Sequence, residues 1–276
     1  MQNQKKEIGY SMSEVYFIVS GKGGVGKSTI AAALGCSLAE QGTRAIILDA
    51  DIGLRSQDAL LGVESRVVYD ILDVINGECQ VSQALLSAAD VPGLSLLPAA
   101  QFARAKDMDG KDVRKVIRSL QESFDYLLID CPAGIERGVR NIVNAGTGHA
   151  ILIVTPDDLC LRDAERVSSL LADKGFERPQ LIVNRLQKKL IQQHEMYTAQ
   201  TVASLLDLPL LGEIPEDPAV YRSQVSHQLL IKTECEATQA VVRISGRLRG
   251  QSVPFPRYGE KVPFFSRRFT RLTNRR

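Results

Sequence analysis

Short apolar runs recur along the chain and alternate with longer segments in which apolar residues follow a helical period. We expect strands over residues 15–19, 45–48, 94–97, 126–129, 150–154, 181–183 and 210–211. Runs that are apolar throughout are typical of strands buried on both faces. Because helical segments separate them, the pattern predicts an α/β fold with a single doubly wound, mostly parallel sheet and helices on both of its faces.

The same pattern divides the chain into four parts. We expect an N-terminal extension over residues 1–12, one compact domain over 13–249, a proline-broken linker over 250–262 and an amphipathic segment over 263–276. The polar start of the chain predicts no signal peptide, and it leaves open whether translation begins at Met1 or Met12. No stretch approaches the ~18 apolar residues that cross a bilayer.

Composition narrows the class of protein. With 276 residues, 44% of them hydrophobic, the chain can bury a large core. The five cysteines and three histidines show no C-x-x-C pair and no other metal-ligand spacing, so we expect buried thiols in a reducing cytoplasm. The net charge is +2, but residues 257–276 carry seven Arg or Lys against one Glu, which is +6 and leaves −4 on the remainder. The basic character is therefore local.

A glycine-rich segment follows the first expected strand. Its sequence, Gly-Lys-Gly-Gly-Val-Gly-Lys-Ser over residues 21–28, fits G-x-x-x-x-G-K-[ST], in which backbone N–H groups turn inward onto phosphates. A helical segment over residues 28–40 comes next, so strand, loop and helix stand in the order that this phosphate-binding loop requires. We therefore expect ATP to bind to Gly21, Lys22, Gly23, Gly24, Val25, Gly26, Lys27, Ser28 and Thr29.

Acidic residues end two of the expected strands. Asp130 closes the run over 126–129, and we expect its carboxylate to hold Mg²⁺, directly or through water, together with the Ser28 hydroxyl. Asp49 and Asp51 follow the run over 45–48, and either carboxylate is placed to orient a water for attack on the γ-phosphate. The residues alone do not choose between these two.

The loop with a second lysine, Lys22, inside it resembles the deviant Walker A motif of the ParA/MinD superfamily of ATPases. Further segments resemble the MinD family within that superfamily, in the expected order along the domain, namely residues 51–55, 66–70, 130–136, 161–166 and 214–217. Two positions depart from the family pattern, because Ser28 replaces the commoner threonine and Ser56 stands where asparagine is usual.

The resemblance implies a homodimer that forms with ATP. In it, Lys22 reaches the phosphates of the opposite subunit, Lys27 holds those of its own subunit, and Asp51 positions the attacking water. The same resemblance implies that Asn184, with Arg185 beside it, contacts adenine. We expect ATP and Mg²⁺ as cofactors and slow hydrolysis without a partner.

The C-terminal segment carries an independent signal. Phe265, Phe269 and Leu272 are spaced as one face of a helix, with Phe264 beside them, and basic residues surround this stripe: Arg267, Arg268, Arg271, Arg275 and Arg276. Such a helix is typical of a segment that lies on an anionic membrane surface. One copy binds weakly, whereas two copies in an ATP-bound dimer bind together. The alternatives are a disordered basic tail and a tail whose phenylalanines dock on the core of the protein itself.

Together these features predict a cytoplasmic ATPase, peripheral on the inner face of the membrane, that helps to select the division septum. The resemblance implies a MinC-like division inhibitor and a MinE-like or other topological regulator as partners, docking on the helix expected over 159–173. A FlhG-like regulator of flagellar number remains an alternative. A ParA-like DNA-partition ATPase is disfavoured by the −4 outside the tail, and an iron–sulfur scaffold by the missing C-x-x-C.

Overall fold

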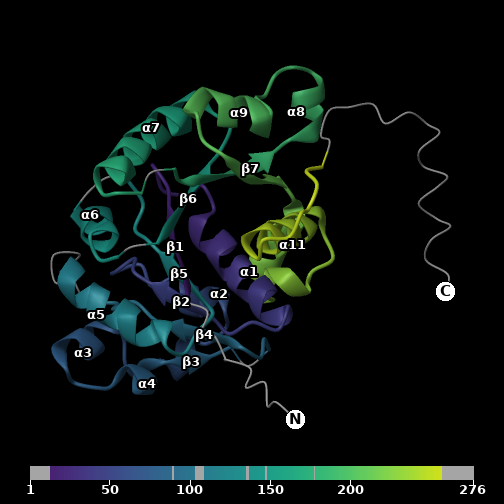
Figure 1. Ribbon diagram of the computed structural model, residues 1–276. Helices are drawn as coiled ribbons and strands as arrows, with labels where there is room; N and C mark the ends of the chain where they lie inside the picture. Colours follow the sequence, from purple (N-terminus) through teal and green to yellow (C-terminus); the bar gives the residue numbers. More distant parts are fainter. Residues whose placement is uncertain are drawn as a thin grey trace, which may run out of the picture.

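The computed structural model describes residues 13–88, 90–102, 109–134, 137–146, 148–176 and 178–256 of the chain. Within these ranges one eight-stranded sheet runs through the molecule in the order β3-β4-β2-β5-β1-β6-β7-β8 (Figure 1). The strands are β1 (Glu14–Val19), β2 (Ala45–Asp49), β3 (Leu86–Ser87), β4 (Leu94–Leu97), β5 (Tyr126–Asp130), β6 (His149–Val154), β7 (Gln180–Leu186) and β8 (Leu210–Pro215). All neighbours pair in parallel except β3 and β4.

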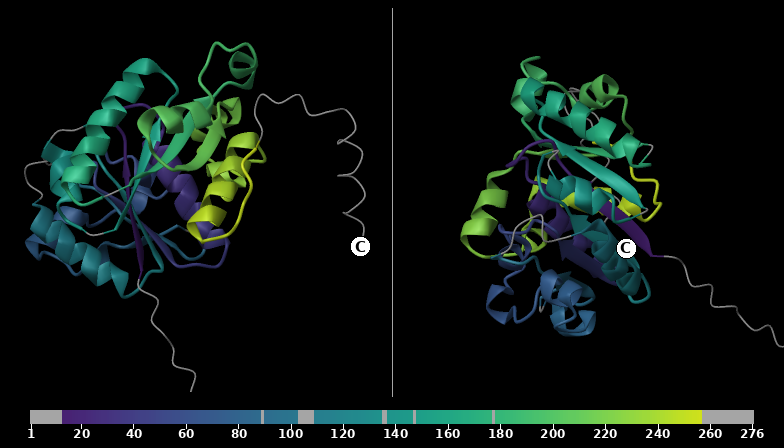
Figure 2. Two further views of the ribbon diagram at one scale, coloured as in Figure 1. Left: turned by 45° about the horizontal axis from the view of Figure 1, so that its top comes forward. Right: turned by 90° about the vertical axis from the view of Figure 1, so that its left-hand side faces the viewer.

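Helices cover both faces of this sheet. The α-helices are α1 (Lys27–Glu40), α2 (Gln57–Leu60), α3 (Ile71–Asn76), α4 (Val81–Ala84), α5 (Gly110–Gln121), α6 (Arg137–Val143), α7 (Asp158–Asp173), α8 (Lys188–Gln192), α9 (Ala199–Leu206), α10 (Pro218–Val225) and α11 (Glu236–Leu248), with short 3₁₀ turns η1 (Glu64–Arg66) and η3 (Leu230–Lys232). α1 and α11 pack together on one face, and α5, α7 and α9 lie on the other (Figures 1 and 2). The predicted doubly wound fold is confirmed.

Burial explains why the strand pattern is readable from the sequence. Five of the six residues of β1 and all five of β2 are buried, because helices lie against both faces of the central strands. α1 is buried almost all round, and it approaches β2 so closely that a Cβ on Gly35 would lie 2.8 Å from the Ile47 side chain. Glycine at this position lets the helix settle on the sheet.

One strand escaped prediction. β3 has only two residues, pairs antiparallel with β4 at the edge of the sheet, and is partly exposed. A two-residue edge strand leaves no periodic signal in the sequence, since its pairing is decided by the backbone of its neighbour.

The last described residues lie against α11. The Arg247 guanidinium donates hydrogen bonds to the carbonyl oxygens of Val253 (3.0 Å), Leu211 (2.9 Å) and Pro254 (2.9 Å), and it stacks on the Phe255 ring at 3.8 Å from the centroid. The start of the expected linker is thus held to the domain. The expected membrane residues Phe264, Phe265, Arg267, Arg268, Phe269, Arg271 and Leu272 lie outside the described residues, as does the extension over 1–12.

Candidate nucleotide site

The phosphate-binding loop lies at the carboxyl edge of the sheet, where ligands of doubly wound folds bind. It joins the end of β1 to the start of α1 at Lys27. Gly26 has φ 94°, and a Cβ there would lie 2.5 Å from Asn184 Nδ2 at the end of β7. A side chain at residue 26 is therefore excluded twice, by backbone conformation and by the neighbouring strand. The loop can approach a ligand through bare backbone.

Lys27 is the buried lysine of the loop. Its ammonium lies 2.5 Å from Asp130 Oδ1 and 3.4 Å from the Ser28 hydroxyl, with the lysine 6% exposed and the aspartate 0%. Burial by itself lowers the pKa of Lys27, but the Asp130 carboxylate outweighs burial and raises that pKa above its ordinary value. The lysine therefore stays charged inside the fold.

Two aspartates at the end of β2 have different surroundings. Asp49 is fully buried, and its two oxygens accept the backbone N–H groups of Asp51 (3.0 Å) and Gln57 (3.1 Å). Burial, and then the charge of Asp130, raise the pKa of Asp49 to about 7. Asp51 is half-buried, and its side chain has no hydrogen bond within the described parts of the chain. Burial raises the pKa of Asp51, while Lys27 opposes this rise. Asp51 is thus the carboxylate left available to a water.

The donor set at the end of β5 fits a magnesium ion that arrives with a nucleotide. The Asp130 carboxylate and the Ser28 hydroxyl both contact the Lys27 ammonium, so this position already accommodates a cation. No group of three or more His, Cys, Asp or Glu suited to a metal occurs among the residues that the structure describes. Mg²⁺ in nucleotide sites characteristically takes one or two protein ligands and completes its shell with phosphates and water. When bound, the ion neutralises charge on the phosphates.

Lys22 points away from this buried pair. Its ammonium lies 3.1 Å from Asp157 Oδ1, with 37% of the lysine side chain and 47% of the aspartate side chain exposed. The hydrogen bond to Asp157 raises the pKa of Lys22. Asp157 also accepts from the Cys160 N–H (2.9 Å) and so caps α7. The two lysines of one loop therefore have separate partners and separate surroundings.

The loop and α7 are also in backbone contact. A Cβ on Gly21 would lie 2.6 Å from the carbonyl carbon of Asp163, which is part of α7. Glycine at residue 21 is required by this approach. The first glycine of the motif thus fixes the helix against the loop, in addition to its place in the phosphate turn.

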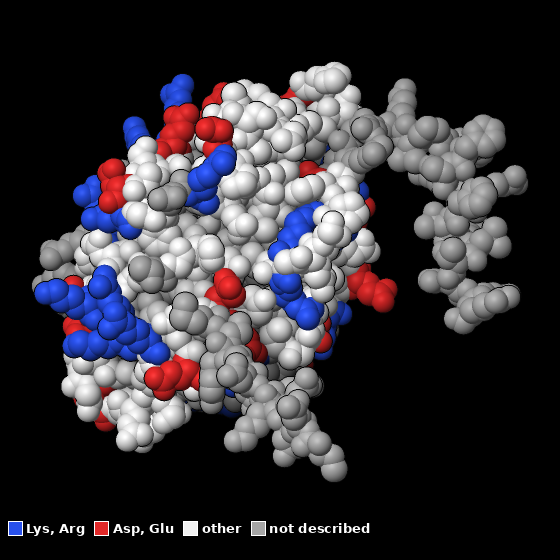
Figure 3. Space-filling model, in the orientation of Figure 1, with Lys and Arg blue, Asp and Glu red and all other residues white. Residues whose placement is uncertain are grey.

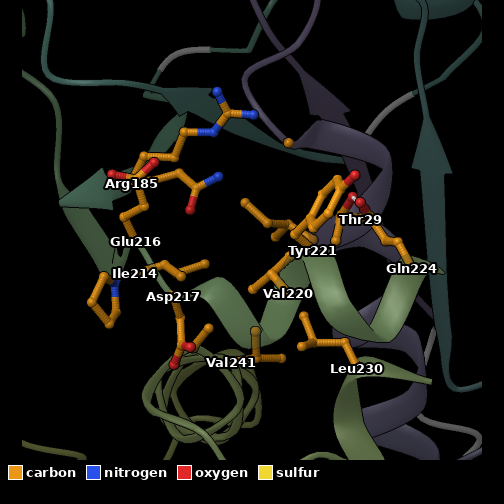
Figure 4. Close-up of a pocket in the computed structure, with 15 residues that line it drawn as sticks. Thr29, Arg185, Ile214, Glu216, Asp217, Val220, Tyr221, Gln224, Leu230 and Val241 are labelled. Atoms are coloured by element: carbon orange, nitrogen blue, oxygen red, sulfur yellow. Dashed lines mark hydrogen bonds between the residues drawn. The ribbon is translucent and has the colours of Figure 1, made fainter. Parts of the chain in front are cut away.

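A cavity of about 340 Å³ opens beside the loop, on the side of β7, β8 and α10 (Figure 4). Its volume lies in the range of small-molecule pockets, ~300–1,000 Å³. Asn184, which donates to the Val25 carbonyl at 2.7 Å, and Arg185, with φ 58°, stand at its rim next to Gly26. The opposite wall combines apolar and polar side chains, namely Thr29, Ile30, Ile214, Pro215, Glu216, Asp217, Val220, Tyr221, Gln224, Leu230, Ala237 and Val241.

The sequence predicted that the loop with Thr29, the carboxylates Asp51 and Asp130, and Asn184 lie at one edge of the sheet, and the structure brings them together there. It did not predict Gln57 or the rest of the cavity wall. Apart from Ile30, that remaining wall comes from residues 214–241, and the segment over 214–217 was the one sequence signal in that part of the chain. Gln57 is a single polar residue without periodic context, so no pattern marks it. Its Nε2 donates to Asp130 Oδ2 at 2.6 Å.

Comparisons with known proteins agree with this geometry. The family model described as "ParA: NUBPL iron-transfer P-loop NTPase" matches residues 11–248. The septum site-determining protein MinD of Synechocystis is 40% identical over 246 residues, covering 88% of this chain and 92% of that protein.

Solved structures of MinD proteins are also similar to this chain. A chain of the MinC:MinD cell division protein complex from Aquifex aeolicus is similar with a TM-score of 0.80 and 36% identity, over 90% of this chain and 100% of that one. The septum site-determining protein MinD of Pyrococcus horikoshii, complexed with Mg-ADP, is similar with a TM-score of 0.77 and 29% identity, over 86% of this chain and 96% of that one.

Proposed function

This chain belongs to the MinD family of P-loop NTPases, and we propose that it is a Mg²⁺-dependent ATPase that dimerises with ATP and helps to place the division septum. In this proposal Lys27, Ser28 and Asp130 hold the phosphates and the magnesium ion, and Asp51 positions the attacking water. The cavity beside Asn184 and Arg185 takes the adenosine. Phosphoryl transfer rests on positioning and charge, which these groups supply.

The observation that carries the dimer is the position of Lys22. A loop that already has a buried phosphate lysine, Lys27, presents a second one at its exposed side. Its partner there is a half-exposed aspartate, and exposed ion pairs contribute little to folding, so Lys22 can leave Asp157 at small cost. A lysine free to leave can reach phosphates that belong to a second subunit.

Membrane attachment in this proposal depends on the C-terminal segment over 263–276. Among the described residues, no helix is both long and apolar enough to cross a bilayer. Arg247 holds residues 253–255 against the domain, at the end of the described chain and N-terminal to this segment. Two such segments in one dimer bind an anionic surface more tightly than one, which ties membrane residence on the inner face to ATP.

Partners of the division system are proposed to dock on α7. Its inner stripe is buried through Cys160, Ala164, Val167 and Leu171, while Leu159 is 68% exposed. The Aquifex relative forms a MinC:MinD complex. Because Lys22 pairs with the residue that caps α7, a partner on this helix lies next to the dimer lysine. We propose a MinC-like inhibitor and a MinE-like or other regulator for this surface.

A basic patch on α5 is relevant to the alternative of a DNA-partition ATPase. Lys and Arg side chains gather over α5 in Figure 3, and this helix exposes Lys111, Arg114, Lys115 and Arg118. Arg114 is engaged with the carbonyl oxygens of Asn144 and Ala145, and Lys115 with Asp112. A partly neutralised patch of this size is small for phosphate-backbone binding. The FlhG-like alternative differs from the MinD-like interpretation only in the MinD-like sequence segments described above.

The test is co-sedimentation of the full chain with anionic vesicles and, separately, with DNA, each in Mg-ATP and in Mg-ADP. We expect sedimentation with vesicles in ATP, release in ADP, and no nucleotide-dependent DNA binding. Truncation before Phe264 and the Phe269→Glu variant should remove vesicle binding. Lys22→Ala should bind ATP yet fail to dimerise by light scattering, with Lys111→Ala as the control. Equal vesicle binding in ATP and ADP, or ATP-dependent DNA binding, would contradict the proposal.

A further inference from the structure

Gln57, the first residue of α2, is buried completely beneath the phosphate-binding loop. Both hydrogens of its side-chain amide are used, because Nε2 donates to Asp130 Oδ2 at 2.6 Å and to the Ser28 carbonyl oxygen at 3.0 Å. These two acceptors fix the orientation of the amide, since a flipped amide would face them with its own oxygen. One side chain thus grips both residues that are expected to serve the magnesium ion.

The two oxygens of Asp130 are divided between two donors. Lys27 holds Oδ1 at 2.5 Å, and Gln57 holds Oδ2 at 2.6 Å. If Lys27 turned to a phosphate, the Gln57 hydrogen bond would still hold Oδ2. Oδ1 would then be the Asp130 oxygen open to the ion or to a water of its shell.

Gln57 also joins this carboxylate to the end of β2. Its backbone N–H donates to Asp49 Oδ2, and the other Asp49 oxygen accepts from the N–H of Asp51. A continuous chain of hydrogen bonds therefore runs from Lys27, through Asp130, Gln57 and Asp49, to the backbone of Asp51, and only its last bond is partly exposed. The segment that carries the water-positioning candidate is attached to the magnesium end of the site.

The fold carries a cost for this arrangement. Gln57 Oε1 is buried without a hydrogen-bond partner, as is the hydroxyl of the preceding Ser56. A buried polar atom left unpaired destabilises a fold. The amide at this position carries that cost at Oε1 while its Nε2 donates to Asp130 and to Ser28, the two residues expected to serve the magnesium ion.

We propose that Gln57 is a positioning residue of the magnesium site, which holds the Asp130 carboxylate and the Ser28 backbone ready for the ion. It does not touch the reacting atoms, because it is fully buried and both amide hydrogens are committed. This inference rests on the proposed binding of Mg-ATP. Groups that orient metal ligands in this way typically change metal affinity by about 10–100-fold when they are lost.

The test measures metal affinity apart from turnover. A fluorescent ATP analogue is titrated onto the full chain in EDTA, and Mg²⁺ is then added at fixed analogue concentration to find the midpoint of its effect. For Gln57→Leu we expect unchanged affinity in EDTA and a Mg²⁺ midpoint raised about tenfold or more. With Mn²⁺ in place of Mg²⁺, electron paramagnetic resonance should show the same weakening. A midpoint within about twofold of wild type would overturn the inference.

A matched control is Gln41→Leu. The Gln41 amide likewise donates two hydrogen bonds, to Ser37 (3.1 Å) and Ser245 (2.7 Å), but it lies at the far end of α1. It should leave the Mg²⁺ midpoint unchanged, and a shift as large as that of Gln57→Leu would overturn the inference by making the effect a general one of lost stability. If Gln57→Leu fails to fold, Gln57→Glu replaces it.

Gln57→Glu sets an acceptor against Asp130, and two carboxylates at this distance keep one proton between them. We expect its Mg²⁺ midpoint to fall as pH rises, because the ion competes with that proton. A midpoint equal to wild type at every pH would overturn the inference. A wild-type protein that binds no ATP analogue would instead defeat the proposed function, and this inference with it.

Discussion

The two ends of α1 hold side-chain networks of opposite kind. At the start of the helix, the buried Lys27 and Asp130 charges meet Gln57, whose oxygen has no partner. At its end, Gln41 is satisfied completely, since it donates to Ser37 and Ser245 and accepts from Arg249 at 2.7 Å. We call the first network, around Gln57, the costly end of α1, because it has a buried oxygen without a hydrogen bond. We call the second, around Gln41, the settled end, because both the Gln41 oxygen and its amide nitrogen are hydrogen-bonded.

The difference shows where the fold tolerates electrostatic cost. The buried Lys27 and Asp130 charges and the unpaired Gln57 oxygen lie at the carboxyl edge of the sheet, where a bound nucleotide and its ion would change their partners. The network between α1 and α11 contains hydroxyls and an amide that are fully paired in the protein alone. Local conflicts of this kind are expected at functional sites and absent from regions that only pack.

The largest difference between the two ends is expected for Lys27→Ala. Removing one partner of a buried ion pair leaves the Asp130 carboxylate without its counter-charge, although Gln57 still donates to it. Such a loss typically costs about 3–5 kcal/mol of folding free energy. It also removes the charge that faces the phosphates, so we expect ATP affinity to fall by about 100-fold or more. Urea unfolding and titration with a fluorescent ATP analogue measure the two effects.

Lys232→Ala is the matched control for this prediction. Lys232 pairs with Glu40 at the far end of α1, and its side chain is 51% exposed. Exposed ion pairs are screened by water, so we expect little change in stability and none in ATP affinity. If the two variants behaved alike, burial would not be what separates the two ends.

The second prediction concerns turnover at the costly end. Asp51→Ala should keep Mg-ATP binding and lose about 100-fold in ATP hydrolysis, because water positioning is removed while the phosphate contacts remain. Steady-state phosphate release and binding of the ATP analogue distinguish the two. Hydrolysis near the wild-type rate would assign the water to another group.

The sequence predicted most of the fold because buried parallel strands read as apolar runs, and all seven expected strands are present. It predicted the loop because the glycine spacing is dictated by close approach of backbone to phosphate. The sequence did not predict which side chains contact one another within the nucleotide site. Gln57 reaches Asp130 across 73 positions of the chain, and Arg185 adopts φ 58° where β7 departs from regular pairing with β8. Such contacts depend on tertiary packing that no local pattern encodes.

The third prediction is a pH dependence that belongs to Asp49. Its pKa, raised to about 7 by burial, means that the folded protein binds this proton more tightly than the unfolded chain does. Its contribution to stability is therefore fully present below the unfolded pKa, about 4, and is lost as pH rises through about 7.

Asp49→Asn removes this titration, so the stability difference between wild type and variant should change with pH. Wild type should lose stability relative to Asp49→Asn as pH rises across that window, by at most about 1.4 kcal/mol per pH unit. Urea unfolding without nucleotide at a series of pH values measures it. Parallel curves for the two proteins would mean that Asp49 is ionised throughout.

The smallest effect is expected at the settled end of α1. Ser245→Ala removes a hydroxyl that lies 2.7 Å from Ser37 Oγ and 2.7 Å from Gln41 Nε2, but those two groups keep their own 3.1 Å hydrogen bond. Because the hydroxyl removed is uncharged and its two partners keep a hydrogen bond to each other, we expect a loss of about 1 kcal/mol in the free energy of unfolding. ATP affinity and the Mg²⁺ midpoint should not change. Ser204→Ala, which removes an exposed hydroxyl bonded to the Gln200 carbonyl, is the control and should be close to neutral. A change in ATP affinity for Ser245→Ala alone would show that α1 transmits packing at its end to the loop at its start, and that the two networks are one.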